Sequence, residues 1–422
     1  VWDGTKISSL SEMKGSGTKE APYEIENGKQ LAYVVSTDLA DGLYYKLVKD
    51  IYLNDVADGT HVKDLEVKEN WLKEYGTTAL PNGSTTNAFA GILNGNGHTI
   101  YGLYTSGAGR SGLFHTIIQG AIIKNISFEN VYLVDGKGYG GAIAGRAHWV
   151  SGKSNAKITN CSVSNAIIGG DMEYTGGLIG NMTDCNAEFT SCYSYNVSLS
   201  NWESKGLGGG IFGNINATST NKVTLTSCYS AGNFVVNSKV NKTGGAINLI
   251  NVYTDVAVPS GNSETDVTVL TTAQMKGEAA KANMVLDYRW TFEIQGDSYP
   301  TFQDEIVEVW DGTKDFNLKG TGSESEPYLI ETAAQLAAIV TSKNSGAYTG
   351  KYFKLTKDIR INDTTSADWK ATAKNWVWAD FRFIGDVDGD GHTIDGLYYK
   401  GGQRVMGLFS YVGADNNGTY KT

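Results

Sequence analysis

Short apolar and polar segments alternate along most of this chain and recur at a nearly constant interval. One segment is a glycine-rich turn before an apolar pair, as in GGAIAG at 140–145 and GGLIG at 176–180. The other places a small apolar residue among polar ones, as in KNISFENV at 124–131 and TNCSVSNA at 159–166. Neither segment has helical periodicity. A fixed repeat of this kind is typical of solenoids, in which each coil packs against its neighbours.

The repeat also predicts how the strands pair. Strands that run in one direction and meet their equivalents one coil later must pair in parallel, and such connections are nearly always right-handed. The sequence therefore predicts an all-β fold, a right-handed parallel β-helix (solenoid) that rises about 4.8 Å per coil. Short capping helices are expected as well, because terminal coils otherwise expose an apolar cross-section and an unpaired edge.

One structural ladder follows directly from the spacing. Its buried column consists of residues 35, 31 and 36 positions apart: Ile126, Cys161, Cys192 and Cys228. The residue before each of these is polar: Asn125, Asn160, Ser191 and Ser227. Asparagine tolerates the left-handed backbone region, and stacked side-chain amides can bond from coil to coil. We therefore interpret both columns as structural.

The column cysteines are predicted to be buried free thiols, since unpaired cysteine behaves as a small apolar residue. A disulfide between stacked neighbours is an alternative, because about 4.8 Å falls within the allowed Cα separation. Cys185 lies off the column in a loop and can be free or paired. No cysteine or histidine spacing typical of zinc sites occurs, so no structural metal is expected.

A second, larger repeat divides the chain. VWDGTK at 1–6 returns at 309–314, and KLVKDIYLND at 46–55 returns as KLTKDIRIND at 354–363. We expect residues 1–305 to form one complete module and residues 306–422 to form the N-terminal portion of a second, truncated module. The parent protein is expected to continue past Thr422 with further domains.

Capping-box spacing predicts three helices. Asn27 precedes Gln30 by three residues, and Thr332 precedes Gln335 likewise, each followed by an apolar face at i, i+3 and i+4. A third helix is expected near 272–283, after Thr271. The first two are interpreted as caps at the module starts and the third as part of a closing segment that includes Trp290.

These motifs, taken in order, resemble a known family. The GG-[IL]-x-G turns, the N-C-x-[SV] segments, the opening WDG…PY-x-IE…QLA and the GNGHTI…GLF stretch are similar to those of bacterial cell-surface proteins that carry the GLUG motif. The resemblance covers nearly the whole chain except the insert at 56–88. It implies an extracellular β-helix in large, modular, often adhesin-like proteins, and related coils accompany immunoglobulin-A peptidases and some carbohydrate-active enzymes. It supplies no set of functional residues.

Composition mainly excludes certain classes of partner. With 35 basic and 45 acidic residues the chain has a net charge of −10, which disfavours nucleic acid and anionic membranes as partners. No apolar run approaches the roughly 20 residues of a membrane helix, so no direct membrane insertion is expected. Together with the resemblance, this predicts an extracellular, secreted or surface-displayed protein.

One acidic turn imitates a calcium loop. Asp386, Asp388 and Asp390 occupy the first, third and fifth positions of an EF-hand-type loop, but Leu397 stands where its bidentate glutamate should be. The equivalent stretch of the first module lacks these carboxylates. We therefore interpret it as a structural turn, leaving a weak calcium site as the alternative; no other cofactor is expected.

Two functions remain open. Glycoside hydrolysis needs two carboxylates about 5–10 Å apart, yet the loop acids do not recur at matching positions and no nucleophile, base or HExxH arrangement can be argued. We therefore expect no enzyme; a polysaccharide lyase, a glycoside hydrolase, or the non-catalytic part of a larger surface peptidase is the alternative. The favoured function is a surface module for adhesion or display that binds a host protein or glycan. Its candidate binding residues are loop tryptophans that could stack on a ligand: Trp71, Trp149 and Trp202.

Overall fold

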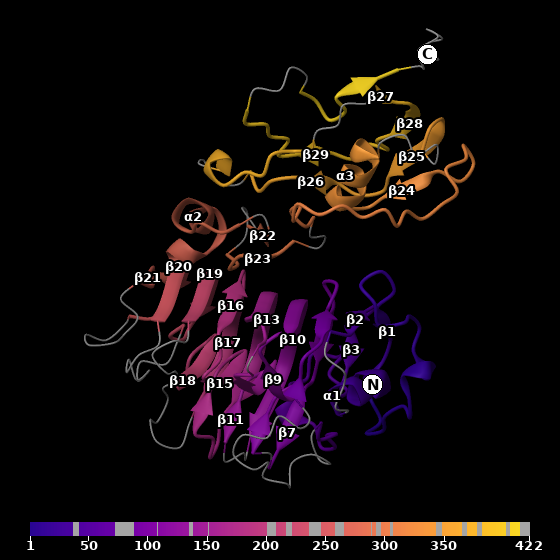
Figure 1. Cartoon of the computed structure of the whole chain (residues 1–422). Coiled ribbons are helices and arrows are strands. Elements are labelled where there is room, and N and C mark those ends of the chain that lie inside the picture. Colours follow the sequence, from indigo (N-terminus) through magenta and orange to yellow (C-terminus); the bar gives the residue numbers. More distant parts are fainter. Residues whose placement is uncertain are drawn as a thin grey trace. The chain divides into compact units, whose positions relative to one another are not determined.

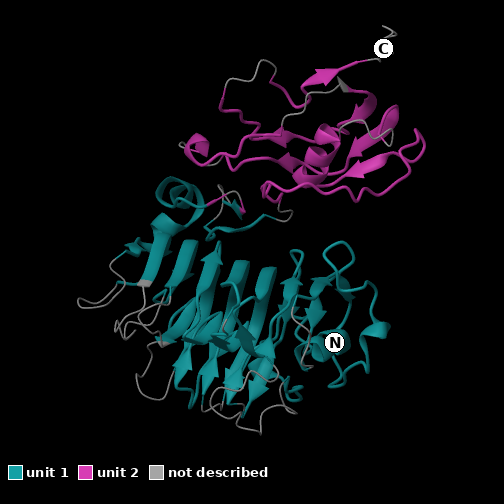
Figure 2. Ribbon diagram, viewed as in Figure 1, with its two compact units in different colours: residues 1–286, 290–304 teal, residues 287–289, 305–422 magenta. Residues whose placement is uncertain are grey.

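The computed structural model divides into two compact units, residues 1–286 with 290–304 and residues 287–289 with 305–422 (Figure 2). It describes all residues except 37–41, 72–87, 108, 135–137, 151, 201–207, 217–221, 236–245, 258–265, 288, 293–296, 304–306, 343–347, 365–368, 378–381, 402–405 and 414–422.

The first unit is built on parallel sheets. In the described residues the largest sheet has thirteen strands, and its strands from successive coils lie side by side (Figure 1). Its main path runs through β1 (Tyr23–Ile25), β2 (Tyr44–Leu47), β5 (Ile92–Asn94), β10 (Ile122–Val134), β13 (Ala156–Ile168), β16 (Ala187–Thr190), β19 (Lys222–Ala231), β20 (Ala246–Thr254) and β21 (Thr268–Val269). Beside this path lie β3 (Ile51–Tyr52), β6 (Thr99–Tyr101), β7 (Tyr104–Ser106) and β17 (Tyr193–Leu199).

Two further parallel sheets lie in the described part of the first unit. One is formed by β8 (Arg110–Ser111), β11 (Tyr139–Gly140) and β14 (Tyr174–Thr175). The other is formed by β4 (Ala88–Phe89), β9 (Phe114–Ile118), β12 (Ala144–His148), β15 (Ile179–Thr183) and β18 (Phe212–Asn216). The chain leaves β10, passes through β11 and β12, and returns as β13 in register beside β10. The architecture is therefore all-β and β-helix-like, with parallel sheets.

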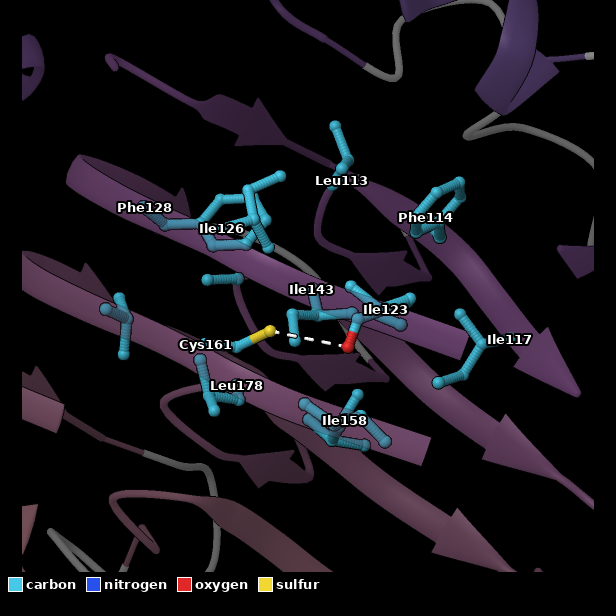
Figure 3. Packing of buried hydrophobic residues seen from close by; sticks show 14 of the residues in the cluster. Leu113, Phe114, Ile117, Ile123, Ile126, Phe128, Ile143, Ile158, Cys161 and Leu178 are labelled. Atoms are coloured by element: carbon cyan, nitrogen blue, oxygen red, sulfur yellow. Dashed lines mark hydrogen bonds between the residues drawn. The ribbon is translucent and has the colours of Figure 1, made fainter. Parts of the chain in front are cut away.

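The buried column lies where the coils meet. Ile126 pairs with Cys161 across β10 and β13, and the backbone N–H of Cys192 lies 3.4 Å from the sulfur of Cys228. All three column cysteines are fully buried free thiols. Figure 3 shows the Cys161 sulfur pointing into the apolar interior, 3.6 Å from the Ile123 carbonyl oxygen. The disulfide alternative is thereby excluded for this column, and Cys185 is likewise a buried free thiol.

The polar column adopts the backbone conformation that its residue types favour. Asn125, Asn160, Ser191 and Ser227 have φ of 54°, 53°, 51° and 53°. The amide of Asn160 donates to the side-chain oxygen of Asn125 at 3.3 Å, and Asn125 donates to that of Asn94 at 3.0 Å. At Asn125 and Asn160 the bend and the amide ladder therefore coincide, because asparagine serves both.

Glycine at the turns is required by close packing. A Cβ on Gly141 would lie 2.7 Å from backbone atoms of Leu178, Ile179 and Gly180 in the next coil. Real Cβ atoms do not approach backbone so closely, so only glycine lets these coils stack here.

The module starts carry helices with almost identical caps. They are α1 (Gly28–Ser36) and α3 (Ala333–Thr341). Asn27 accepts from the Gln30 N–H at 3.1 Å, and Thr332 accepts from the Gln335 N–H at 3.2 Å. In each case the glutamine oxygen accepts from the residue before the cap rather than from the cap itself.

The closing segment differs from the sequence prediction. Instead of one helix over 272–283, a 3₁₀ turn at Thr272–Met275 precedes a short helix α2 (Gly277–Asn283). The break falls at Lys276, whose extended backbone (φ −125°, ψ 148°) ends the 3₁₀ turn and caps the helix. The segment ends in an antiparallel pair, β22 (Trp290–Thr291) and β23 (Thr301–Phe302), where Trp290 packs on Tyr193 and Tyr229.

The second unit has the same kinds of element. Its parallel pairs are formed by β24 (Tyr328–Ile330), β25 (Lys351–Leu355) and β28 (Gly385–Asp388), by β26 (Ile359–Arg360) and β29 (Ile394–Asp395), and by β27 (Arg382–Phe383) and β30 (Tyr411–Val412). Short 3₁₀ turns complete the described elements at Leu10–Glu12, Val62–Asp64 and Trp369–Ala371.

Candidate functional site: a tyrosine-lined groove

An open groove of about 690 Å³ lies against the largest sheet of the first unit. Phe128 of β10 is buried in the core and Glu129 lines the groove, because neighbouring side chains of a strand point to opposite faces. We call this feature the outer groove. Its lining comprises Tyr52, Val56, Ala57, Gly59, His61, Tyr101, Glu129, Asn130, Asn165, Ala166, Ile167, Asn196 and Ser198.

A stacked tyrosine pair forms one end of the lining. Tyr52 of β3 is the register partner of Tyr101 of β6, so the two rings sit on the same side of neighbouring strands. Their ring centroids are 4.6 Å apart with planes inclined by 10°. Both side chains are half-buried, which leaves part of each ring on the groove.

The second unit shows that the fold does not need these tyrosines. The equivalent register pair there is Arg360 and Asp395, from the copies KDIR and HTID of the segments KDIY and HTIY. Its side chains form an ion pair at 3.6 Å instead of an aromatic stack. The same backbone pairing thus tolerates very different outward side chains, so the tyrosine pair is free to serve recognition.

A second asparagine ladder borders the groove. Asn130, Asn165 and Asn196 adopt φ of 59°, 49° and 50°. The amide of Asn196 donates to the Asn165 side-chain oxygen at 2.6 Å, and Asn165 donates to the Glu129 carboxylate at 3.2 Å. The groove therefore offers amides and one oriented carboxylate beside the aromatic surface.

The described start of the insert forms a wall of the groove. Asn130 donates to the Thr60 carbonyl at 2.8 Å and accepts from the Val62 N–H at 2.7 Å. His61 contacts the Asn165 carbonyl through Nε2 at 3.1 Å and accepts from the Lys63 N–H through Nδ1 at 3.1 Å. This network assigns the proton to Nε2. Burial lowers the pKa of His61, so the ring is neutral at pH 7.

The tryptophans that the sequence singled out do not meet at this groove. The prediction that Trp71 is a surface binding residue is wrong, because its side chain is only 4% exposed. Its indole N–H donates to the Leu113 carbonyl at 3.0 Å, and its ring packs edge-on against Trp2. Trp149 follows β12 and is 46% exposed. Trp202 and residues 72–87 of the insert lie outside the described residues. The ladder residues are buried between coils and unavailable to a ligand.

Two carboxylates of the acidic turn in the second unit already have bonding partners within the protein. Asp388 accepts from the Asp390 N–H at 2.9 Å, and Asp390 pairs with the Lys354 ammonium at 3.0 Å. Within the described ranges, no group of three carboxylate, histidine or cysteine side chains is placed to hold a metal ion.

Sequence reasoning missed the outer groove, although a signal was present. Tyr52 and Tyr101 are replaced by Arg360 and Asp395 in the second copy, although the flanking residues are nearly the same. A position that varies between such copies is not required by the fold. The closure of the groove by the insert was not visible, because it depends on contacts to Asn130 and Asn165 about 70 and 104 residues away.

Comparison with known proteins shows that segments of the chain are similar to parts of longer proteins. No family model matches the chain. Halomucin of Haloquadratum walsbyi is 31% identical over 183 residues, which are 43% of this chain and 2% of halomucin. A candidate glycine-rich membrane protein of Evansella cellulosilytica is 31% identical over 121 residues, 28% of this chain and 12% of that protein. The chain thus spans a small part of each relative.

One solved structure is similar over a longer stretch. A candidate immunoglobulin A1 protease of Bacteroides ovatus matches with a TM-score of 0.40 and 19% identity, covering 69% of this chain and 95% of that one. The architecture described above rests on the strand pairing of this chain itself. Across the described residues, no helix has both the length and the apolar character needed to span a bilayer.

Proposed function

We propose that this chain is a non-catalytic module of an extracellular or surface-displayed protein, and that it binds a glycan along the outer groove. The observation that carries this proposal is the stacked pair Tyr52 and Tyr101, which lines the groove and is replaced in the second unit without change of strand pairing. Aromatic faces pack on the apolar faces of sugar rings, and amides bond their hydroxyls.

The wider setting supports the same proposal. The 31% identical segments belong to halomucin and to a candidate membrane protein, both much longer than the matched region. We infer membership of the GLUG-motif surface proteins from the turn and segment motifs, and a right-handed coil from the general preference of parallel crossovers. The net charge of −10 disfavours nucleic acid as a partner and is compatible with glycan or protein ligands.

Chemistry at the groove favours binding over hydrolysis. Among the described lining residues Glu129 is the single carboxylate, whereas glycoside hydrolysis by the common mechanisms uses two. Glu129 is also oriented by Asn165, which suits an acceptor for sugar hydroxyls. The enzyme alternative predicts product release from polysaccharides, which an assay on a polysaccharide panel detects.

The test uses the full chain on a glycan array, followed by titration calorimetry with any ligand found. The variant Tyr52→Arg/Tyr101→Asp copies the pair present in the second unit, so it should keep the fold while removing the aromatic surface. We expect it to weaken binding roughly 5- to 10-fold, the loss of one favourable aromatic contact. Arg360→Ala/Asp395→Ala changes the equivalent positions of the second unit and should leave binding unchanged.

Other results would change the assignment. Full binding by the double tyrosine variant would remove the outer groove as the site. Silence on glycans combined with capture of a purified host-surface protein would assign a protein ligand. Release of oligosaccharides from a polysaccharide panel would overturn the non-catalytic proposal.

A further inference from the structure

Two arginines approach each other on a face of the first unit that the outer groove does not use. Arg146 of β12 is the register partner of Thr116 of β9, and the guanidinium of Arg110 donates to the Thr116 hydroxyl at 3.3 Å. A Cβ on Gly145, which precedes Arg146, would lie 2.7 Å from the Cβ of Arg110, so the two arginines start from neighbouring backbone positions. Arg146 is 9% exposed, and Arg110 is half-buried.

Within the described parts of the chain, no carboxylate lies within ion-pair distance of Arg110 or Arg146. Arg146 donates to the Thr183 hydroxyl at 3.1 Å and to Nδ1 of His148 at 3.0 Å, both neutral acceptors. Asp184 acts on Arg146 only from a longer distance. A buried and a half-buried like charge, with no carboxylate at ion-pair distance among the described residues, are costly in a chain whose net charge is −10.

The histidines beside this pair carry no charge of their own at pH 7. Burial, followed by the neighbouring Arg146, lowers the pKa of the Arg110 guanidinium, which nonetheless stays charged. Burial and then Arg110 lower the pKa of His115 to about 4, and burial and then Arg146 lower that of His148. Both imidazoles are thus neutral at pH 7, and the two guanidiniums supply the positive field.

A buried and a half-buried amide continue the column of Arg146, and an exposed tryptophan lies beside it. In the column of Arg146, Asn181 of β15 donates to the Thr183 hydroxyl at 3.4 Å and accepts from Asn214 of β18 at 3.1 Å. Trp149, 46% exposed, follows His148 in the chain, and its backbone N–H donates to the Thr183 carbonyl at 3.2 Å. Amides therefore continue from the cationic position across two coils.

We propose that Arg110 and Arg146 form a binding site for an oxyanion, a carboxylate or sulfate group, carried by an acidic glycan. Guanidinium groups match the planar or tetrahedral geometry of such oxyanions and bind them with charge-assisted hydrogen bonds. The bound group would supply the missing counter-charge between the two arginines. The site lies on other strands than the outer groove and does not depend on it.

The test measures binding of the full chain to three polymers: dextran sulfate, polygalacturonate and uncharged dextran. Wild-type protein should bind a charged polymer in preference to dextran. Arg146→Gln should weaken that binding about tenfold or more, the usual loss for a charge-assisted contact. The matched control Lys157→Gln removes the same charge from β13, where Lys157 pairs with Glu188 at 3.6 Å, and should change affinity less than about twofold.

The three polymers and the variants distinguish the possible ligands. Preference for dextran sulfate assigns a sulfated ligand, and preference for polygalacturonate assigns a uronate. Arg110→Gln, at a more exposed side chain, decides the question if Arg146→Gln lowers the unfolding temperature. Equal losses in Lys157→Gln and the arginine variants, or no wild-type preference for either charged polymer, would overturn the site. Tyr52→Arg/Tyr101→Asp should leave oxyanion binding intact, so failure of the groove proposal is visible separately.

Discussion

A single buried asparagine ties the wall of the outer groove to the solenoid, and its removal should loosen that wall selectively. Asn54 is 3% exposed. Its amide donates to the carbonyls of Gly102 at 2.8 Å and Glu69 at 3.2 Å, and its oxygen accepts from the Glu69 N–H at 2.7 Å. Asn54→Ala deletes all three bonds and leaves buried backbone groups without partners.

The size of the effect follows from these bonds. Each intramolecular hydrogen bond contributes about 1 kcal/mol net, so the three together stabilise the closed segment by roughly 3 kcal/mol. The loss should be local, because the coil strands on either side keep their own ladders. Hydrogen exchange at the Glu69 amide should then accelerate about 100-fold, since 1.4 kcal/mol corresponds to a factor of ten.

The chain contains its own control for this experiment. Asn362 makes the same three bonds in the second unit, to Gly396 at 2.8 Å and to Lys374 at 3.0 and 2.7 Å. Asn362→Ala should accelerate exchange at the Lys374 amide by a similar factor without affecting ligand binding at the outer groove. Asn54→Ala should weaken that binding. Unchanged Glu69 protection in Asn54→Ala, or equal effects of both variants on binding, would refute the reasoning.

Three further predictions concern stability. Gly141→Ala should prevent stable stacking and cost several kcal/mol in denaturant unfolding, because its Cβ would meet backbone atoms at 2.7 Å; Gly109→Ala, with open space around its Cβ, should be nearly neutral. Phe128→Ala, at a fully buried ring, should cost about 3–5 kcal/mol in the same assay, and a loss below 1 kcal/mol would contradict the packing described. His115 has its pKa lowered from 6.5 to about 4, so the unfolded chain binds more protons between these values and stability should fall by about 3 kcal/mol as the pH drops through that window. His115→Gln should flatten this dependence in urea titrations at pH 7 and pH 4.

The sequence determined the parts of this protein that depend on repetition. Equal spacing placed Ile126 opposite Cys161, because parallel strands one coil apart must share a register. Asparagine before the buried position predicted the left-handed bend at Asn125 and Asn160. Capping signals located α1 and α3, because the cap bonds are made within a few residues. Local and periodic rules suffice for such features.

Tertiary structure alone decided which outward residues can meet a ligand. Trp71 looked like a loop aromatic, yet contacts with Trp2 and Leu113 bury it, and no periodicity predicts those contacts. Arg110 and Arg146 lie 36 residues apart and become neighbours only because β12 pairs with β9, whose Thr116 accepts a hydrogen bond from Arg110. Side chains on the outside of a solenoid are under no packing constraint to repeat. Their arrangement therefore depends on which coil and which loop lie beside them in space, and spacing along the chain leaves that open.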